Sequence, residues 1–113
     1  MWRKDLESLD KPYRSVLGKL LSFLLEVFGE NLVSLVVFGS VARGDYRRDS
    51  DIDLLLVVRN LPKGRFRRVE LFEKAEEKLE KDLNALFDKD YYISFSPIIK
   101  TPEEGSGFIV TSN

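Results

Sequence analysis

Two short apolar runs constrain most strongly what this chain can fold into. Residues Leu32 to Phe38 and residues Asp51 to Val58 are nearly all apolar apart from the aspartates and one serine, and they are rich in Leu and Val. Runs of this length and composition are typical of strands that are covered on both faces. The sequence therefore predicts two buried strands, joined by a polar and charged segment from Val41 to Ser50.

A helix is predicted on the N-terminal side of the first strand. Asp10 is a suitable N-cap and Pro12 fits the first helical turn. Apolar residues then recur at helical spacing as far as Phe28, and Gly29 ends the pattern. We expect this helix to bury its apolar stripe against the strands.

After the second strand, residues 61–64 predict a turn, and an amphipathic pattern from about Phe66 to Phe87 predicts one long helix. Asp90 to Lys100 predicts a third strand, in which Pro97 indicates an edge or a bulge. A chain of 113 residues with this order fits one domain. The expected fold class is α/β (α+β), with a small mixed sheet and helices packed on one side.

The C-terminal residues depart from this pattern. Thr101 and Pro102, followed by two acidic residues, predict the start of a helix. No helical pattern continues after Gly105. We expect a single domain over residues 1–113, in which residues 101–113 are a tail that either adds a small extra strand or remains from a shortened chain that lost a final helix.

Composition excludes several classes of protein. The chain has 18 Lys and Arg against 19 Asp and Glu, and it has no Cys and no His. Disulfides, Cys or His nucleophile systems and ordinary zinc sites are therefore excluded, so any metal must bind oxygen ligands. The balanced charge argues against binding duplex DNA through phosphates alone. The absence of Gln, with abundant Glu, Lys and Arg, resembles the composition of proteins from hot environments.

The expected location is the cytoplasm. The charged N-terminal residues lack a secretory signal, and no apolar run approaches the roughly 18 residues that span a bilayer.

The residues on either side of the polar segment carry the chemistry. Gly39 leaves the first strand and lets the backbone approach a ligand, and Ser40 with the following N–H groups can hold a phosphate. Asp51 and Asp53 are two residues apart on a strand, so both side chains leave the same face. Carboxylates so placed can bind Mg²⁺ together with substrate phosphates. The pattern predicts metal-assisted nucleotidyl transfer.

This pattern resembles the signature of the DNA polymerase β-like nucleotidyltransferase superfamily, in particular its minimal (MNT) branch. Gly39 and Ser40 are followed by ten residues and then by the sequence Asp51-Ile52-Asp53, within the segment from Leu32 to Val58. The resemblance implies a palm-like fold, ATP or another NTP as donor, and Mg²⁺ or Mn²⁺ as cofactor.

The resemblance also implies the roles of individual residues and partners. Asp51 and Asp53 would be the catalytic metal ligands, and Gly39, Ser40 and Arg43 would contact the triphosphate. The implied reaction is the transfer of a nucleoside monophosphate, with AMP as the main candidate, from an NTP to a hydroxyl acceptor. The implied partner is a HEPN-domain protein, for which this chain would be the antitoxin. A homo-oligomer stays open, no membrane partner is expected, and the sequence gives no strong evidence for a nucleic-acid partner.

One position departs from the family pattern. Full nucleotidyltransferases usually present a third carboxylate from a later strand, where this sequence has Ser94, Ser96 and Ile98 on one face by alternation. Asp90 or Asp88 would have to supply the acid instead. The alternative function is therefore a non-catalytic binding module that neutralises a partner by occlusion.

Two plainer interpretations concern the basic residues. Arg43, Arg47 or Arg48 could neutralise the two aspartates in a structural ion-pair cluster. The cluster from Arg65 to Arg68, with Lys63 nearby, could bind RNA or a nucleotide tail, but we expect it to face solvent.

Overall fold

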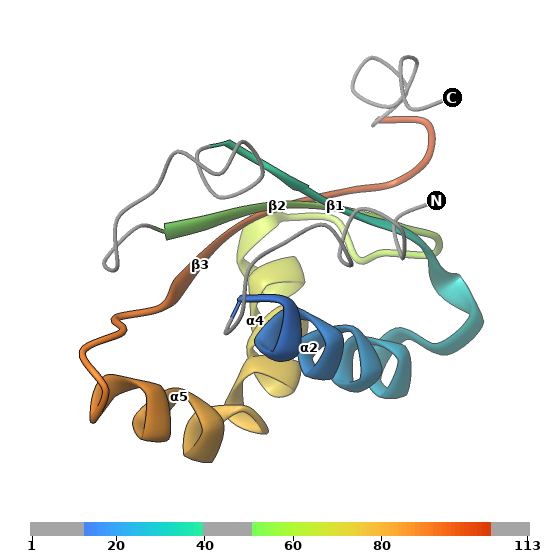
Figure 1. Cartoon of the computed structure of the whole chain (residues 1–113). Helices are drawn as coiled ribbons and strands as arrows, with labels where there is room; N and C mark the ends of the chain where they lie inside the picture. The colour runs from blue at the N-terminus through green and yellow to red at the C-terminus, as the bar shows by residue number, and fades with distance from the viewer. Residues whose placement is uncertain (1–12, 40–50, 105–113) are drawn as a thin grey trace.

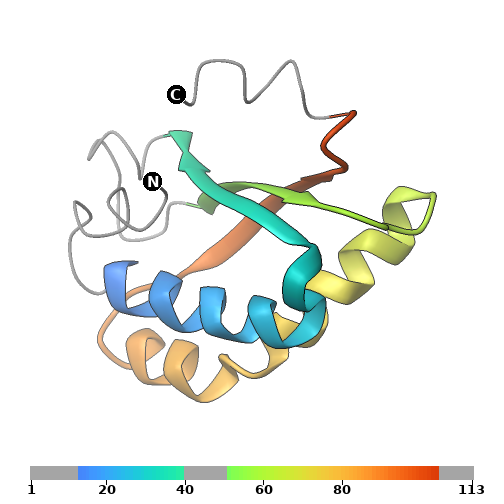
Figure 2. The same ribbon diagram turned by 90° about the vertical axis from the view of Figure 1, so that its right-hand side faces the viewer.

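The structure is a computed structural model that describes residues 13–39 and 51–104. Its strands form one mixed sheet, and the helices lie on the same side of that sheet (Figure 1). A view turned by 90° shows the same two-layer arrangement (Figure 2). The elements are α2 (Tyr13–Phe28), the short 3₁₀ turn η1 (Gly29–Asn31), β1 (Leu32–Phe38), β2 (Asp51–Val58), α4 (Arg65–Glu77), α5 (Glu80–Phe87) and β3 (Ser94–Lys100). The predicted fold class is confirmed.

Strand β2 is the middle strand of this sheet, whose order is β1-β2-β3. It runs antiparallel to β1 and parallel to β3. Its residues from Leu54 to Val58 are all buried, as predicted for a strand covered on both faces. The same prediction for β1 is wrong, because β1 is the outer strand of the described sheet: Leu35 is buried, but Val33 and Phe38 are 37% and 38% exposed.

Helix α2 supplies much of the core below the sheet. It ends at Phe28, and Gly29 has a φ of 58°, so the predicted end is confirmed. Its buried side chains form one stripe at helical spacing (Tyr13, Val16, Leu17, Leu20, Leu21, Leu24 and Phe28). Each such Leu contributes about 1.5–3 kcal/mol through burial. Asp10 and Pro12, the predicted helix start, lie outside the described residues.

The predicted single helix from Phe66 to Phe87 is two helices. Helix α4 ends in a turn with two hydrogen bonds. Lys78 N–H donates to Ala75 O at 3.1 Å, and Leu79 N–H donates to Glu76 O at 2.9 Å. These i to i−3 bonds tighten the turn, and α5 continues in a new direction (Figure 1). Leu79 at the break is fully buried, so the change of direction accompanies the insertion of this side chain into the core.

Strand β3 begins at Ser94, four residues later than predicted, because a helix-ending turn occupies the preceding residues. Asp90 has a φ of 70°, and its N–H donates to Phe87 O at 2.9 Å. Tyr91 N–H donates to Leu86 O at 2.9 Å, which completes a Schellman-type end of α5. The predicted edge position of Pro97 is confirmed, since β3 is the other outer strand of the described sheet.

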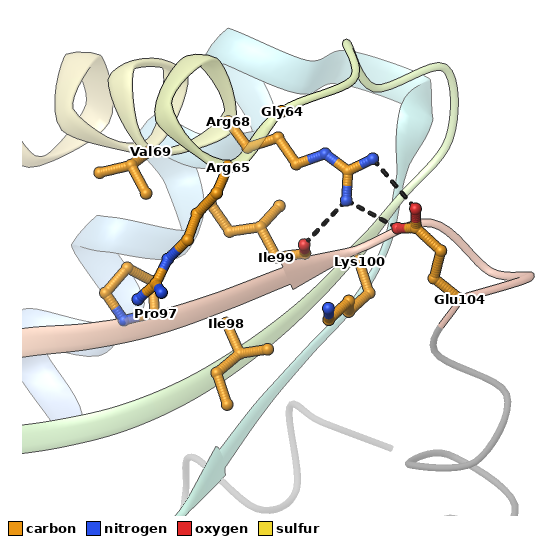
Figure 3. Close-up of a pocket in the computed structure, with 9 residues that line it drawn as sticks. All are labelled: Gly64, Arg65, Arg68, Val69, Pro97, Ile98, Ile99, Lys100 and Glu104. Carbon is orange, nitrogen blue, oxygen red and sulfur yellow. Dashed lines mark hydrogen bonds and ion pairs between the residues drawn. The ribbon is translucent and has the colours of Figure 1, made fainter.

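Arg68 fastens the far end of β3 to α4 (Figure 3). Its side chain is only 11% exposed, and its Nε donates to Pro62 O at 2.8 Å while one terminal nitrogen donates to Ile99 O at 3.2 Å. The guanidinium also binds both carboxylate oxygens of Glu104, at 2.6 and 3.2 Å. The expectation that this basic cluster faces solvent is therefore wrong for Arg68, because its guanidinium group joins α4 to the loop before it, to β3 and to Glu104.

Thr101 and Glu104 form a capping box, as the predicted helix start requires. Glu104 N–H donates to Thr101 Oγ1 at 3.2 Å, and Thr101 N–H donates to a Glu104 carboxylate oxygen at 3.0 Å. The hydrogen bonds from Arg68, together with those from Thr101, lower the pKa of Glu104 to about 2. Residues from 105 onward lie outside the described part, so the two expectations for the tail stay predictions.

The described helices include none that combines the length and the apolar character needed to cross a bilayer.

Candidate active site

Three strand ends meet at one end of the sheet. Because β1 and β2 are antiparallel, the last residue of β1 lies beside the start of β2, with Phe38 opposite Asp53. Because β2 and β3 are parallel, their first residues also lie together, with Asp51 opposite Ser94. The sheet thus brings Gly39, the two aspartates and the first serine of β3 to one place.

Gly39 lies directly against the carboxylate of Asp53. The φ of Gly39 is 77°, a backbone conformation that L side chains rarely adopt. A Cβ at this position would collide with Asp53 Oδ2 and stand 3.1 Å from Asp53 Cγ. Only glycine fits both the turn and the carboxylate, so the predicted meeting of a glycine backbone with an acidic side chain is observed.

Asp51 has a different neighbour. It is exposed, whereas Asp53 is half-buried, and Ser94 Oγ donates a hydrogen bond to Asp51 Oδ1. The register places Ser96 opposite Asp53 and Ile98 opposite Leu55, on the side of β3 that alternation predicted. Residues on this side alternate with the core residues Ile52 and Leu54, so the two aspartates lie on the sheet face that is turned away from the helices.

A third acid does not join the two aspartates among the described residues. Within residues 13–39 and 51–104, no three acidic side chains come together in a way that could hold a metal ion. Asp90 belongs to the turn after α5, and Ser94 occupies the place beside Asp51. The described part of the site therefore offers two carboxylates and two serine hydroxyls.

These groups fit a hard divalent cation. Carboxylates of Asp51 and Asp53 lie side by side on one strand, and their oxygens are the ligand type that Mg²⁺ takes together with substrate phosphates. Among the described residues, no Lys or Arg forms an ion pair with either aspartate. The remaining predicted residues, Ser40 and Arg43, lie outside the described ranges, as do the arginines of the ion-pair interpretation.

Sequence reasoning placed Ser94 on the correct face but did not identify it as the partner of Asp51. The spacing of serines on β3 was a signal for the face. The hydrogen bond depends on the register between β2 and β3, which joins residues that are 43 positions apart.

A second hollow lies at the opposite end of the sheet (Figure 3). It has a volume of about 450 Å³, and its lining includes Arg65, Arg68 and Lys100. The hollow runs along β3 from Pro97, which lies opposite Leu54, to Lys100, which lies opposite Val57. Lys100, at its basic end, is therefore four residues along the sheet from the level of Asp53, roughly 13 Å.

Comparison with known proteins agrees with this geometry. The pattern of the nucleotidyltransferase domain family matches residues 17–105. Two curated relatives from Methanocaldococcus jannaschii, each named as an inferred protein adenylyltransferase, are similar to the chain. The first is 35% identical over 95 residues, which are 84% of this chain and 59% of the relative. The second is 31% identical over 83 residues, which are 74% of each protein.

The chain thus spans 59% of the length of the first relative. No solved structure matches the chain significantly. The family match includes Gly39, Asp51 and Asp53, the three residues that the sheet brings together, and it covers every described strand. This chain therefore belongs to the nucleotidyltransferase domain family.

Proposed function

We propose that the protein transfers a nucleoside monophosphate, in the first instance AMP from ATP, to a hydroxyl group of a protein acceptor. The observation that carries this proposal is the contact between the Asp53 carboxylate and Gly39, with Asp51 beside it on the same strand. The names of the two relatives support AMP as the transferred group and a protein as the acceptor.

Each residue then has a defined task. The backbone at Gly39, with Ser40 and Arg43, binds the β and γ phosphates and places the α phosphorus over the aspartates. Asp51 and Asp53 would hold divalent cations, which would supply stabilisation of the attacking and leaving oxygens. Ser94 holds Asp51 in position through its hydrogen bond. In the reaction, the acceptor hydroxyl gives its proton to water and its oxygen bonds to the α phosphorus. The bond between the α phosphorus and the bridging oxygen breaks, and pyrophosphate leaves.

We propose a HEPN-domain protein as the acceptor and this chain as its antitoxin, as the family resemblance implies. The two aspartates lie on the sheet face that is turned away from the helices, where a second protein can approach them, and this supports a protein partner. Modification of the partner, or contact with it, would then suppress the partner's activity.

The test uses purified protein, Mg²⁺, labelled ATP and a HEPN-domain partner. We expect AMP on the partner with the wild type and none with the double variant Asp51→Asn, Asp53→Asn, because the cation ligands are lost. The matched control removes two carboxylates from the exposed face of α4, Glu73→Gln with Glu77→Gln, and should label as the wild type does. Equal labelling by the aspartate variant would refute the enzymatic proposal.

A second candidate function rests on the serines of β3. Ser94 and Ser96 stand where a third acid is expected, and this favours a non-catalytic module that binds and occludes its partner. Calorimetry separates the two functions. Tight partner binding without Mg-ATP, together with no AMP on the partner by mass spectrometry, would support the module.

A further inference from the structure

The hollow beside β3 carries positive charge that the fold does not use. Its lining includes three cationic side chains, Arg65, Arg68 and Lys100, and one acidic side chain, Glu104. Arg68 is neutralised, because its guanidinium binds both carboxylate oxygens of Glu104. Within the described part of the chain, neither Arg65 nor Lys100 forms an ion pair. We refer to the space that these two side chains border as the Arg65–Lys100 hollow.

Stability of the fold does not explain Arg65. It is the first residue of α4, where the helix dipole disfavours a cation, and the first turn of α4 contains no acidic residue that would offset its charge. Lys100 is half-buried at the end of β3. Two cations that border one hollow without an acidic partner repel each other, so their placement favours a negatively charged ligand.

Lys100 lies on the same sheet face as the two aspartates. By alternation along β3 it shares a face with Ser96, which lies opposite Asp53. Arg65 reaches the outer edge of β3 from α4, and its side chain is turned toward Pro97 (Figure 3). The two cations therefore stand at the border of the face that carries the aspartates.

The separation between the hollow and the aspartates matches a short stretch of polypeptide. Lys100 is four residues along β3 from Ser96, which corresponds to roughly 13 Å. An extended peptide also rises about 3.3 Å per residue. When a hydroxyl of such a peptide lies at the aspartates, a residue four positions away therefore arrives at Lys100.

The direction of the proposed reaction leaves the β3 side to the acceptor. Gly39 follows β1 on one side of β2, and β3 lies on the other side. With pyrophosphate leaving toward Gly39, in-line attack requires the acceptor oxygen to approach from the opposite side. The acceptor chain thus passes the edge along which the hollow runs.

The lining restricts the chemistry of the ligand. Arg and Lys bind carboxylates through charge-assisted hydrogen bonds, and Val69 and Ile98 offer apolar contact to the methylene groups of an acidic side chain. A nucleic acid would need a longer basic surface, because its affinity depends on contacts with several phosphates. Only two cations of this hollow are left without an acidic partner among the described residues, so its charge suits an acidic polypeptide better.

We propose that the Arg65–Lys100 hollow binds an acidic side chain of the acceptor polypeptide, about four residues from the hydroxyl that receives AMP. This inference rests on the proposed function and adds the element that selects the acceptor. Arg65 and Lys100 are specificity residues in it and take no part in the chemical step. They hold the acceptor through their side chains and not through strand pairing, because Pro97 has no N–H to donate.

The test compares three synthetic peptides of equal length, each with one serine as its only hydroxyl group. The first carries glutamate four positions from the serine on both sides, and the second carries glutamine there. With the wild type, Mg²⁺ and ATP, we expect AMP incorporation per unit time to be about fivefold higher for the first peptide, the effect of one partly exposed ion pair. The third peptide has its glutamates two positions from the serine, at the level of Ile98, and should be labelled like the second.

Charge reversal provides the variant. Arg65→Glu with Lys100→Glu should label the glutamate peptide more slowly than the glutamine peptide, and a peptide with lysine at the same positions fastest. Its affinity for Mg-ATP, measured by calorimetry, should equal that of the wild type. The matched control Arg67→Glu with Lys74→Glu makes the same change in charge on exposed residues of α4 outside the hollow and should keep the wild-type preference. Circular dichroism melting curves verify that each variant is folded.

The outcomes separate this inference from the proposed function. A wild type that binds Mg-ATP but labels the first and third peptides alike, or labels none, overturns the docking inference. Weakened Mg-ATP binding by the charge-reversal variant also overturns it, because the hollow would then hold phosphates of the nucleotide. Binding of a single-stranded RNA oligonucleotide that only this variant loses would assign the hollow to RNA instead. A wild type that neither binds Mg-ATP nor transfers AMP refutes the proposed function itself.

Discussion

Gly39 is the residue whose replacement tests the site most directly. Gly39→Ala introduces a Cβ at a φ of 77° and into the carboxylate of Asp53. The left-handed backbone alone costs roughly 1–2 kcal/mol for an L residue. We expect a loss of about 2 kcal/mol or more in the free energy of unfolding, and at least a tenfold loss of Mg-ATP affinity, measured by denaturation and calorimetry.

Two other glycines provide matched controls for this substitution. Gly29 also has a positive φ, 58°, but a Cβ there meets no atom within 4 Å, so Gly29→Ala should lose stability without losing nucleotide affinity. Gly18 lies on the exposed side of α2, so Gly18→Ala should stabilise the protein by about 0.5–1 kcal/mol. If Gly39→Ala binds Mg-ATP as Gly29→Ala does, the close approach to Asp53 is not required for binding.

Glu104 gives a prediction for acid conditions. Its hydrogen bonds from Arg68 and Thr101 lower its pKa from 4.5 to about 2. The folded state therefore binds this proton less readily than the unfolded state, and the resulting stabilisation is complete above about pH 4.5 and disappears as the pH falls through 2. Carbon NMR should show a Glu104 midpoint near 2, and Arg68→Met should move it back toward 4.5.

The stability difference between the wild type and Glu104→Gln provides the complementary measurement. This difference should be constant near neutral pH and should diminish toward pH 2, because the protonated glutamate then resembles glutamine. A Glu104 midpoint that stays at 4.5 in the wild type would contradict the contact with Arg68.

At the scale of elements, the break between α4 and α5 depends on Leu79. This side chain is fully buried in the core, whereas its neighbours Lys78 and Glu80 are exposed and continue the charged face. Leu79→Ala should lower the free energy of unfolding by about 2–5 kcal/mol through the cavity that it creates. Urea denaturation measures this loss. The control Leu25→Ala removes the same atoms from a side chain that is 45% exposed and should cost less than half as much.

Most of the elements could be predicted because their limits are local. The bounds of β1 and β2 follow from the apolar runs that end at Phe38 and begin at Asp51. The end of α2 follows from Gly29. The break at Leu79 could not be predicted, because the apolar spacing continues through it and only tertiary packing selects the tighter turn.

The candidate site was predictable to the same degree. Alternation along β2 and the glycine after β1 indicated which side chains share a face, and the structure brings Gly39 and Asp53 together accordingly. The exposure of β1 and the bond from Ser94 to Asp51 were not predictable, since both depend on which strand pairs with β2 on each side. Such pairing joins distant residues and leaves no local pattern.

At the scale of the whole molecule, the proposed role of the two aspartates in binding predicts a cost in stability. They are like charges about 7 Å apart on one strand, so their repulsion without a cation costs roughly 0.6 kcal/mol in water. The variant Asp51→Asn, Asp53→Asn should melt at the same temperature as the wild type or slightly above it. Mg-ATP should raise the melting temperature of the wild type and leave that of the variant unchanged, as thermal denaturation will measure.

The opposite outcome has a clear meaning. A variant that melts far below the wild type would show that the two carboxylates stabilise the fold through partners of their own, as the ion-pair interpretation requires.

No described strand pairs with the outer side of β3, and this has a consequence for association between copies of the protein. Pro97 has no N–H to donate, and the carbonyl of Ile99, two residues on and therefore on the same side, is already taken by Arg68. A strand from another copy could not pair regularly with this edge, because Pro97 lacks an N–H donor and the Ile99 carbonyl already accepts a hydrogen bond from Arg68. Pairing of β3 edges between copies is therefore disfavoured, and this reduces the tendency of the domain to aggregate at high protein concentration.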